Sequence, residues 1–210
     1  MKELKYIFGS EPRVKIMRLF LFNEDIPYDV EEVSLRGKVS LPIARKEVAI
    51  LLKIGFLQKK KYVKEMTITP ARKGTPAVTK KKSVAGFMLN KKFPLVDPLR
   101  ALLIESNLVS MKDMPTRFKG AGQIKLLILS GIFVRDNDRS VDLLLVGNKL
   151  DKKMVEQSMK ILEAEIGKEI RYAIFEEGDF VYRMNMYDKL LRDIFDYEYK
   201  SVLNKLDVRL

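Results

Sequence analysis

Residues that start or stop helices divide residues 11–55 into three short helical segments. The first segment covers residues 11–22. Asp29 is followed three residues later by Glu32, and this spacing predicts a capping box at the start of a second helix. Gly37 ends that helix, and a third one begins close behind it. Two short helices joined by a tight turn that contains glycine form a helix-turn-helix, so we expect this motif here.

The third helix has one apolar side and one side of small and basic residues. Ser40 is its expected N-cap, with Pro42 in the first turn, and Gly55 is its stop. The apolar stripe at helical spacing consists of Leu41, Ala44, Val48 and Leu51. The opposite side carries Pro42, Arg45, Lys46, Ala49 and Lys53. A helix in the major groove of DNA presents such a face, although any surface helix can carry Arg45 and Lys46.

The positive charge of the chain is concentrated in one segment. The net charge is +12, and residues 56–95 hold eleven Lys or Arg against one Asp or Glu. Residues 1–55 hold ten against eight, and residues 123–210 hold fifteen against sixteen. A basic block of this kind indicates a polyanionic partner, either nucleic acid or an anionic membrane surface. The alternative interpretation is a solvated, lysine-rich loop.

The basic block has the pattern of a β-hairpin. Residues 56–64 and 82–90 are expected to be strands, and residues 67–79 between them have the Thr, Pro and Gly content of a long hairpin tip. Three helices followed by a basic hairpin make a winged helix, so we predict double-stranded DNA as the partner. The predicted DNA contacts are Ser40, Pro42, Arg45, Lys46, Lys59, Lys60, Lys61, Lys64, Lys80, Lys81 and Lys82.

The predicted contacts divide into two kinds. Arg45 and Lys46 are candidates for base edges or phosphates, and the Ser40 hydroxyl can donate to a phosphate at the helix N-terminus. The hairpin lysines would bind phosphates without sequence preference. A single module covers one half-site, so we expect a homodimer on a two-fold site.

Three short runs carry a family resemblance in this half of the chain. They are Leu-Pro-Ile-Ala-Arg-Lys-Glu-Val at residues 41–48, Leu-Lys-Ile-Gly-Phe-Leu at residues 52–57 with the lysines that follow, and Phe-Met-Leu-Asn at residues 87–90. With these runs, residues 10–90 resemble the winged-helix transcriptional regulators of bacteria and archaea. The resemblance implies a sequence-specific DNA-binding protein that regulates transcription.

The second half alternates buried-strand runs with helical patterns. The expected strands cover residues 124–134, 141–147 and 170–175. The expected helices cover residues 151–166 and 180–195. The fold class is therefore predicted as α+β. The expected divisions are a first domain at 1–94, a connecting helix and linker at 95–122, a second domain at 123–197 and a helical tail at 198–210.

The second half also carries a family resemblance. Residues 127–147, with Gly-Lys-Glu-Ile-Arg-Tyr-Ala-Ile at 167–174 and Glu-Gly-Asp-Phe-Val-Tyr-Arg at 177–183, are similar to the minimal nucleotidyltransferase domain. The resemblance implies a Gly-Ser turn that holds the nucleotide phosphates. It also implies an Asp-x-Asp pair and a third carboxylate that bind two magnesium ions.

The chain departs from that pattern at the residues that would do the chemistry. Gly131 is present, but Ile132 follows it, and Ser140 stands where the first Asp of the pair would be. Only Asp142 remains, and one carboxylate cannot hold two magnesium ions. We therefore expect a degenerate nucleotide site at Gly131, Ser140 and Asp142, with no catalysis, metal or cofactor. Asp142 can equally be a structural residue at a strand end, and the domain would then serve dimerisation or sense a ligand such as a nucleotide.

Missing residue types narrow the possible chemistry. The chain has no cysteine and no histidine, which excludes disulfides, Cys-ligated metals and His-based catalysis. We find no signal-peptide pattern, and the most apolar run, residues 126–134, is far shorter than the about 20 residues that cross a bilayer. We expect a cytoplasmic protein without a membrane partner that is not an enzyme. Two alternatives stay open, an active magnesium-dependent nucleotidyltransferase and an antitoxin-like partner-binding protein.

Overall fold

A computed structural model describes residues 2–68, 78–105 and 113–206. These residues combine helices and strands, which agrees with the mixed α and β class that the sequence predicts. The chain divides into two compact units, Met1–Glu105 (unit 1) and Ser106–Leu210 (unit 2). Among the helices in the described ranges, none has the length and apolar character needed to cross a membrane.

Unit 1 begins with four helices, α1 (Lys2–Phe8), α2 (Glu11–Phe22), α3 (Val30–Gly37) and α4 (Leu41–Lys53). The predicted capping box of α3 is confirmed. Asp29 accepts a hydrogen bond from the backbone N–H of Glu32 at 2.8 Å, and the Glu32 carboxylate accepts one from the backbone N–H of Asp29 at 3.0 Å. Gly55, with φ +83°, turns the chain from α4 into the hairpin that follows.

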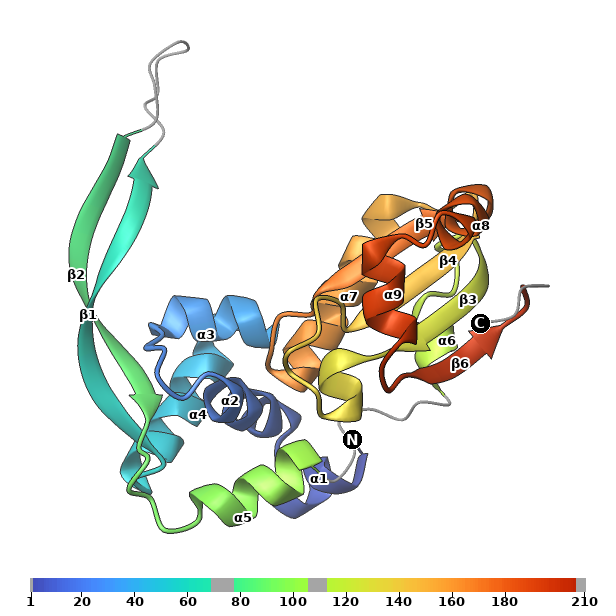
Figure 1. Cartoon of the computed structure of the whole chain (residues 1–210). Coiled ribbons are helices and arrows are strands. Elements are labelled where there is room, and N and C mark those ends of the chain that lie inside the picture. Colours follow the sequence, from blue (N-terminus) through green and yellow to red (C-terminus); the bar gives the residue numbers. More distant parts are fainter. Residues whose placement is uncertain (1, 69–77, 106–112, 207–210) are drawn as a thin grey trace. The chain divides into compact units, whose positions relative to one another are not determined.

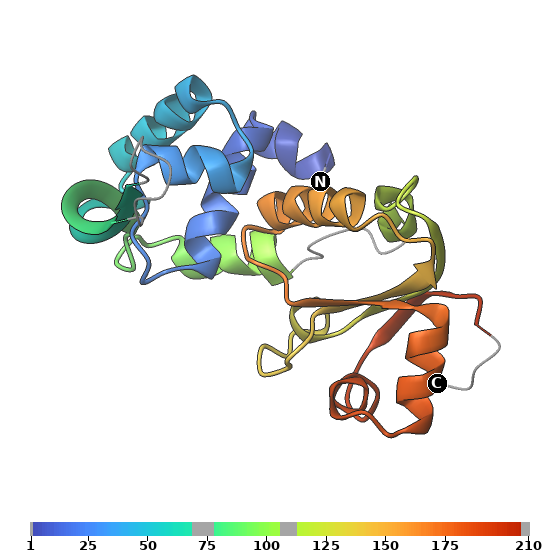
Figure 2. The same cartoon turned by 90° about the horizontal axis from the view of Figure 1, so that it is seen from above.

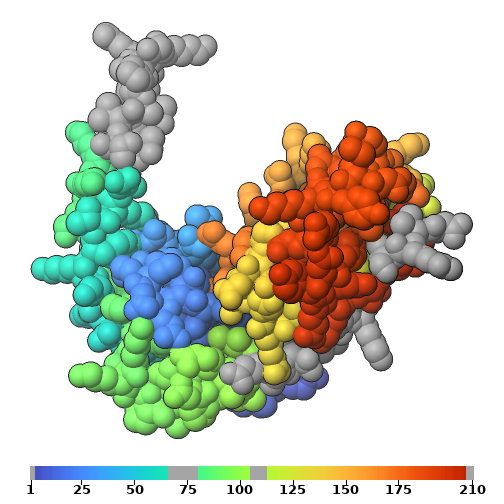
Figure 3. Space-filling view, viewed as in Figure 1, coloured from blue at the N-terminus to red at the C-terminus, as the bar shows by residue number. Residues whose placement is uncertain are grey.

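A long antiparallel hairpin follows the helices; its base lies against them, and its outer part extends beyond them (Figures 1 and 3). Its strands, β1 (Leu57–Ile68) and β2 (Val78–Leu89), pair residue by residue over their whole length. Twelve residues of strand span about 40 Å. Both strands reach further toward the tip than predicted, because Thr, Ile and Val at 67, 68, 78 and 79 favour strand. The rest of the predicted tip, residues 69–77, lies outside the described residues.

Tyr28 joins the base of the hairpin to the helices. Its N–H donates to the Phe87 carbonyl at 2.9 Å, and the Phe87 N–H donates to the Tyr28 carbonyl at 2.8 Å. The Tyr28 ring also meets Phe20 of α2 edge to face, with the ring centroids 5.8 Å apart. One core therefore joins the helices and the hairpin base, and it includes Val14, Val33, Val48, Leu51, Phe56, Leu57 and Leu89.

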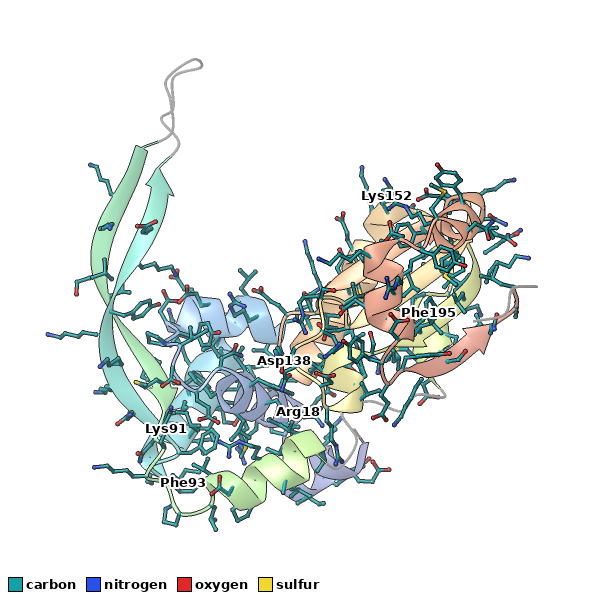
Figure 4. The ribbon with its side chains drawn as sticks, viewed as in Figure 1. Arg18, Lys91, Phe93, Asp138, Lys152 and Phe195 are labelled. Carbon is teal, nitrogen blue, oxygen red and sulfur yellow. The ribbon has the colours of Figure 1, made fainter. Side chains whose placement is uncertain are left out.

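The segment after the hairpin completes unit 1. There α5 (Val96–Arg100) runs into a π-helical turn, η1 (Ala101–Glu105). Leu103 is buried in the unit 1 core, and Arg18, which lies inside the helical part of this unit (Figure 4), donates from Nε to the Leu103 carbonyl at 2.8 Å. The first part of the predicted connecting segment, residues 95–105, thus belongs to unit 1.

Unit 2 is built on a four-stranded sheet in the order β5-β4-β3-β6. The strands are β3 (Gln123–Leu129), β4 (Leu143–Asn148), β5 (Tyr172–Glu176) and β6 (Lys200–Asn204). β3 pairs antiparallel with β4 and β6, whereas β4 and β5 are parallel. The helices are α6 (Met114–Arg117), the 3-10 turn η3 (Gly131–Val134), α7 (Lys152–Ile166), α8 (Glu177–Asn185) and α9 (Lys189–Phe195).

Helices cover both faces of this sheet (Figure 2). Phe180 of α8 and Leu191 of α9 are buried on one face against Leu126 of β3. α7 covers the other face with its buried residues Val155, Met159, Leu162, Ala164 and Ile166. Residues 143–146 are fully buried, which explains why β4 is a continuous apolar run. Phe118, in the predicted linker, is buried as well and belongs to unit 2.

Three expectations for unit 2 are wrong. Residues 131–134 form the turn η3 instead of continuing a strand, because Gly131 has a positive φ that leaves the extended conformation. The helix predicted over residues 180–195 is two helices, because Tyr187 takes a left-handed conformation between them. The helical tail is wrong too, since residues 200–204 form an edge strand on β3.

Candidate nucleic-acid interface

The outward face of α4 carries the side chains that we expect to approach DNA. Pro42, Arg45 and Lys46 are exposed, while the predicted inner residues Ala44, Val48 and Leu51 are buried. Ser40 holds the N-cap position, but its hydroxyl makes no capping hydrogen bond. A capping bond would use the hydroxyl oxygen as acceptor, so the hydroxyl hydrogen of Ser40 can donate to a ligand at the start of α4 with or without that bond.

Glu47 fixes α4 from its inner side. Its carboxylate accepts hydrogen bonds from Nε of Arg13 at 2.8 Å and from the Ser10 hydroxyl at 2.7 Å. The Glu47 side chain is only 6% exposed, so it is a buried charge that needs these partners. Both partners belong to the start of α2, and the bonds fix the direction in which Arg45 and Lys46 project.

The strand register divides the hairpin lysines between two faces. Residues two apart on a strand share a face, so Lys59 and Lys61 lie on one side of β1 and Lys60 lies on the other. Lys64 shares the face of Lys60 and stands opposite Lys82. The lysines along the described strands are exposed, except for the half-buried Lys64. They therefore form a basic rod (Figure 4 draws its side chains), not a single basic surface.

Two of the predicted hairpin lysines take part in ion pairs. Nζ of Lys64 lies 2.7 Å from Asp29 and 3.1 Å from Glu32. Nζ of Lys81 lies 3.4 Å from Glu65, but both of these side chains are more than 60% exposed, so that pair contributes little. Within the described part of the chain, no ion pair involves the other hairpin candidates, which are Lys59, Lys60, Lys61, Lys80 and Lys82.

A groove of about 570 Å³ lies between α4, the start of α3 and β2. Arg45 of α4 and Lys82 of β2 both line it, and Lys64 and Asp29 line it as well. Its apolar surface comes from Leu41, Val84 and Phe87. The groove thus brings together three of the predicted contacts, while the remaining predicted contacts lie outside its lining.

Four side chains join β1 to the start of α3, and we call them the α3–hairpin cluster: Asp29, Glu32, Tyr62 and Lys64. The Tyr62 hydroxyl donates to the Glu32 carboxylate and accepts from the backbone N–H of Asp29 at 3.1 Å. Lys64 donates to Asp29 at 2.7 Å, and this bond is the main reason that the pKa of Lys64 is raised. Burial, followed by the bond to Glu32, raises the pKa of Tyr62.

Gly86 leaves the space that this cluster needs. A Cβ atom at Gly86 would lie 2.6 Å from Cε1 of Tyr62 and 2.9 Å from the carbonyl oxygen of Tyr28. The Tyr62 ring therefore passes over Gly86 of β2 on its way to α3. An isolated glycine in a strand pattern indicates such a close approach, so the sequence held a signal for this contact.

The degenerate nucleotide site expected in unit 2 is only partly assembled. The backbone N–H of Ile132 donates to Oδ1 of Asp142 at 3.0 Å, and a Cβ at Gly131 would lie 2.1 Å from the same oxygen. Ser140 instead bonds to Asp193 of α9. Its N–H donates to that carboxylate at 2.9 Å, and its hydroxyl donates to the same carboxylate. Gly131 and Asp142 are thus in contact, and Ser140 is not part of their group.

The Asp142 carboxylate is fully buried, and Arg171 donates hydrogen bonds to both of its oxygens. Oδ2 accepts from the Arg171 backbone N–H at 2.9 Å and from Nε at 3.0 Å, while Oδ1 accepts from a terminal guanidinium nitrogen at 2.9 Å. The bonds to Asp142 raise the pKa of Arg171. Among the residues that the structure describes, no group of three or more acids is arranged to hold a metal ion. These contacts support the structural interpretation of Asp142.

A scan against protein-family models and searches of the curated proteins and of the solved structures found no match for this chain.

Sequence reasoning missed three residues that organise these sites. Glu47 follows Arg45 and Lys46 directly, and nothing in that run marks it as a buried acid. Arg171 was missed because it lies 29 residues from its partner Asp142. Tyr62 is the single aromatic residue in a lysine-rich strand, which is a usable signal together with Gly86. The partners themselves could not be read from spacing, because each comes from a distant element.

Proposed function

We propose that unit 1 is a winged-helix domain that binds double-stranded DNA with sequence preference, and that the chain regulates transcription. The order of elements supports this proposal, since two short helices, α3 and α4, are followed by a basic hairpin, which is the order expected of a winged helix-turn-helix. The exposed basic side of α4 supports it as well.

The observation that carries the proposal is the groove shared by α4 and β2. Arg45 comes from the helix and Lys82 from the strand, and no ion pair among the described residues engages either side chain. Cations that reach one groove from two elements can hold a phosphate backbone between them. Two acids line this groove. Asp29 is already paired with Lys64, which lowers its repulsion of a phosphate, and Glu31 is exposed, so that solvent and salt screen its charge.

The two elements would do different work. Arg45 and Lys46 would reach base edges or the neighbouring phosphates, and a bidentate arginine contact to a base discriminates by about 1–3 kcal/mol. The unpaired hairpin lysines would bind phosphates of any sequence. With six or more phosphate contacts, log K against log salt should have a slope of about −5 or steeper.

For unit 2 we propose a nucleotidyltransferase-like fold without catalysis that serves dimerisation or senses a ligand. The bonds between Asp142 and Arg171 support this, since they occupy the carboxylate that a metal would need. Magnesium-dependent transfer from labelled nucleoside triphosphates that Asp142→Asn abolishes would overturn this proposal.

The test of DNA binding is selection of duplexes by the full chain from a random pool, followed by a salt titration of the selected duplexes. We expect an enriched two-fold sequence and a slope of about −5 or steeper. Arg45→Gln should relax the preference at one position of each half-site, and the triple variant Lys59→Gln, Lys60→Gln, Lys61→Gln should flatten the slope by up to about three.

The matched control removes lysines from the other unit. Lys152 and Lys153 are exposed at the start of α7, so Lys152→Gln with Lys153→Gln lowers the net charge without touching unit 1. The control should bind like the wild type. No enrichment, or equal losses in the control and the hairpin variant, would refute the proposal.

A further inference from the structure

We infer that Tyr62 and Lys64 are positioning residues, which fix the hairpin against α3. The hairpin lysines without ion pairs in the described part of the chain then keep one direction relative to α4; they are Lys59, Lys60, Lys61, Lys80 and Lys82. This inference rests on the proposed function and deepens it, because it divides the hairpin residues into those that touch DNA and those that hold the hairpin. It also takes Lys64 out of the predicted DNA contacts.

The hairpin needs such a support because of its length. Tyr28 pairs with β2 only at Phe87, near the hairpin base. Beyond Phe87 the described rungs continue to Ile68–Val78, nine residues further along β2. A two-stranded hairpin is marginally stable by itself, so an unsupported rod of this length would bend and twist.

The α3–hairpin cluster supplies a second attachment further out. Tyr62 bonds to Glu32 and to the backbone of Asp29, and Lys64 bridges the Asp29 and Glu32 carboxylates. These carboxylates are themselves fixed by the capping box of α3. The contact is thus made to a rigid helix end, and hydrogen bonds to charged groups are stronger than neutral ones.

The same cluster changes the charge beside the groove. Without Lys64, the Asp29 carboxylate, which lines the groove together with Arg45 and Lys82, would stand unpaired and would repel a phosphate backbone. Because Nζ of Lys64 lies within 3.1 Å of the Asp29 and Glu32 carboxylates, its ammonium group is already paired with both of them. A DNA phosphate would have to compete with two carboxylates for it, whereas Lys61 has no ion pair among the described residues.

The first measurement uses the free protein, so it does not depend on DNA binding. Amide hydrogen exchange of β1 and β2 is compared between the wild type, Tyr62→Phe and Lys64→Gln. Loss of one charge-assisted bond should speed the exchange of the hairpin amides about fivefold to tenfold. The matched control is Tyr6→Phe, which removes the hydroxyl of a residue of α1 that is 82% exposed and should leave these rates unchanged.

The second measurement uses a selected duplex, or a random duplex at low salt. Tyr62→Phe should weaken binding about threefold to tenfold with an unchanged salt slope, because an ordering cost is added and no charge is changed. Lys64→Gln should weaken binding at least as much, because it also leaves the Asp29 carboxylate unpaired beside the groove. Lys61→Gln should flatten the slope by about one and leave the exchange rates unchanged.

The outcomes separate this inference from the proposed function. A flatter slope for Lys64→Gln with wild-type exchange rates would make Lys64 a phosphate ligand and overturn the inference. Wild-type exchange in both variants would overturn it too. If the wild-type chain binds no duplex, the proposed DNA binding fails, and the exchange rates alone still decide whether the cluster fixes the hairpin.

Discussion

At the scale of single residues, Gly86 is the position where the hairpin tolerates least change. A methyl group there would meet the Tyr62 ring and the carbonyl oxygen of Tyr28, and the backbone atom cannot move away cheaply. We expect Gly86→Ala to lower the free energy of unfolding by about 1–3 kcal/mol, measured by urea unfolding. Gly178→Ala is the control, because no atom lies within 4 Å of its Cβ position on α8, and helix propensity there favours alanine. Equal stability of Gly86→Ala and the wild type would contradict the contact.

In unit 2, Asp142 is a single residue whose substitution should also lower stability. In Asp142→Asn, one acceptor oxygen becomes an N–H₂ group that faces the donors of Ile132 and Arg171. The Arg171 side chain is 43% exposed and can turn to water. The free energy of unfolding should therefore fall by about 2–3 kcal/mol, which is less than the cost of leaving a buried charge without a partner. Thermal unfolding measures it, and Asp138→Asn at an exposed site should change the stability by less than about 0.5 kcal/mol. A similar small effect for both variants would mean that the Asp142 bonds are unimportant.

At the scale of elements, the attachment of the hairpin to α3 should depend on pH. Burial alone would raise the pKa of Asp29, but the bonds from Lys64 and from the backbone of Glu32 outweigh it and lower the pKa. A lowered pKa means that the stabilisation is present above the unfolded value of about 4 and is lost as the pH falls through the folded value. The raised pKa of Lys64 means that its contribution is lost only as the pH rises above about 10.5.

Asp29→Asn isolates this charge, because asparagine caps helices as well as aspartate does. We expect the wild type to exceed Asp29→Asn in stability at pH 7 and the difference to shrink between about pH 5 and pH 3. Urea unfolding at a series of pH values measures it. Asp25→Asn is the control, since that side chain is 82% exposed and its difference should be small at every pH. A difference for Asp29→Asn that does not change with pH would contradict the role of the ionised carboxylate.

At the scale of the whole molecule, the proposed helix-turn-helix would cover one half-site, so we expect two chains to share a two-fold DNA site. Light scattering of the full chain with a selected duplex should give two chains per duplex. The half-sites should lie about 10 base pairs apart, or a multiple of that, since both α4 helices would enter the same side of the double helix. A single chain on a non-palindromic site would contradict this expectation and leave unit 2 without a role in dimerisation.

The sequence alone predicted the features whose causes lie within a few residues. The capping box of Asp29 and Glu32, the start of α4 behind Ser40 and the basic hairpin follow from local hydrogen bonding and side-chain periodicity. The strands of unit 2 that are buried on both faces could be predicted as well, because a short, continuous apolar run is typical of a fully buried strand. The mixed α and β class of the fold and the position of the positive charge could thus be predicted from local sequence.

The tertiary structure decided which distant residues meet. Lys64 has the same sequence character as Lys60 and Lys61, and only the path of β1 past α3 gives it two carboxylates more than 30 residues away. Likewise, Arg171 reaches Asp142, and residues 200–204 pair with β3, because packing brought these segments together. Spacing along a chain encodes a turn or a cap, but a partner across the core depends on the geometry of every element between the two residues, and no short pattern contains that.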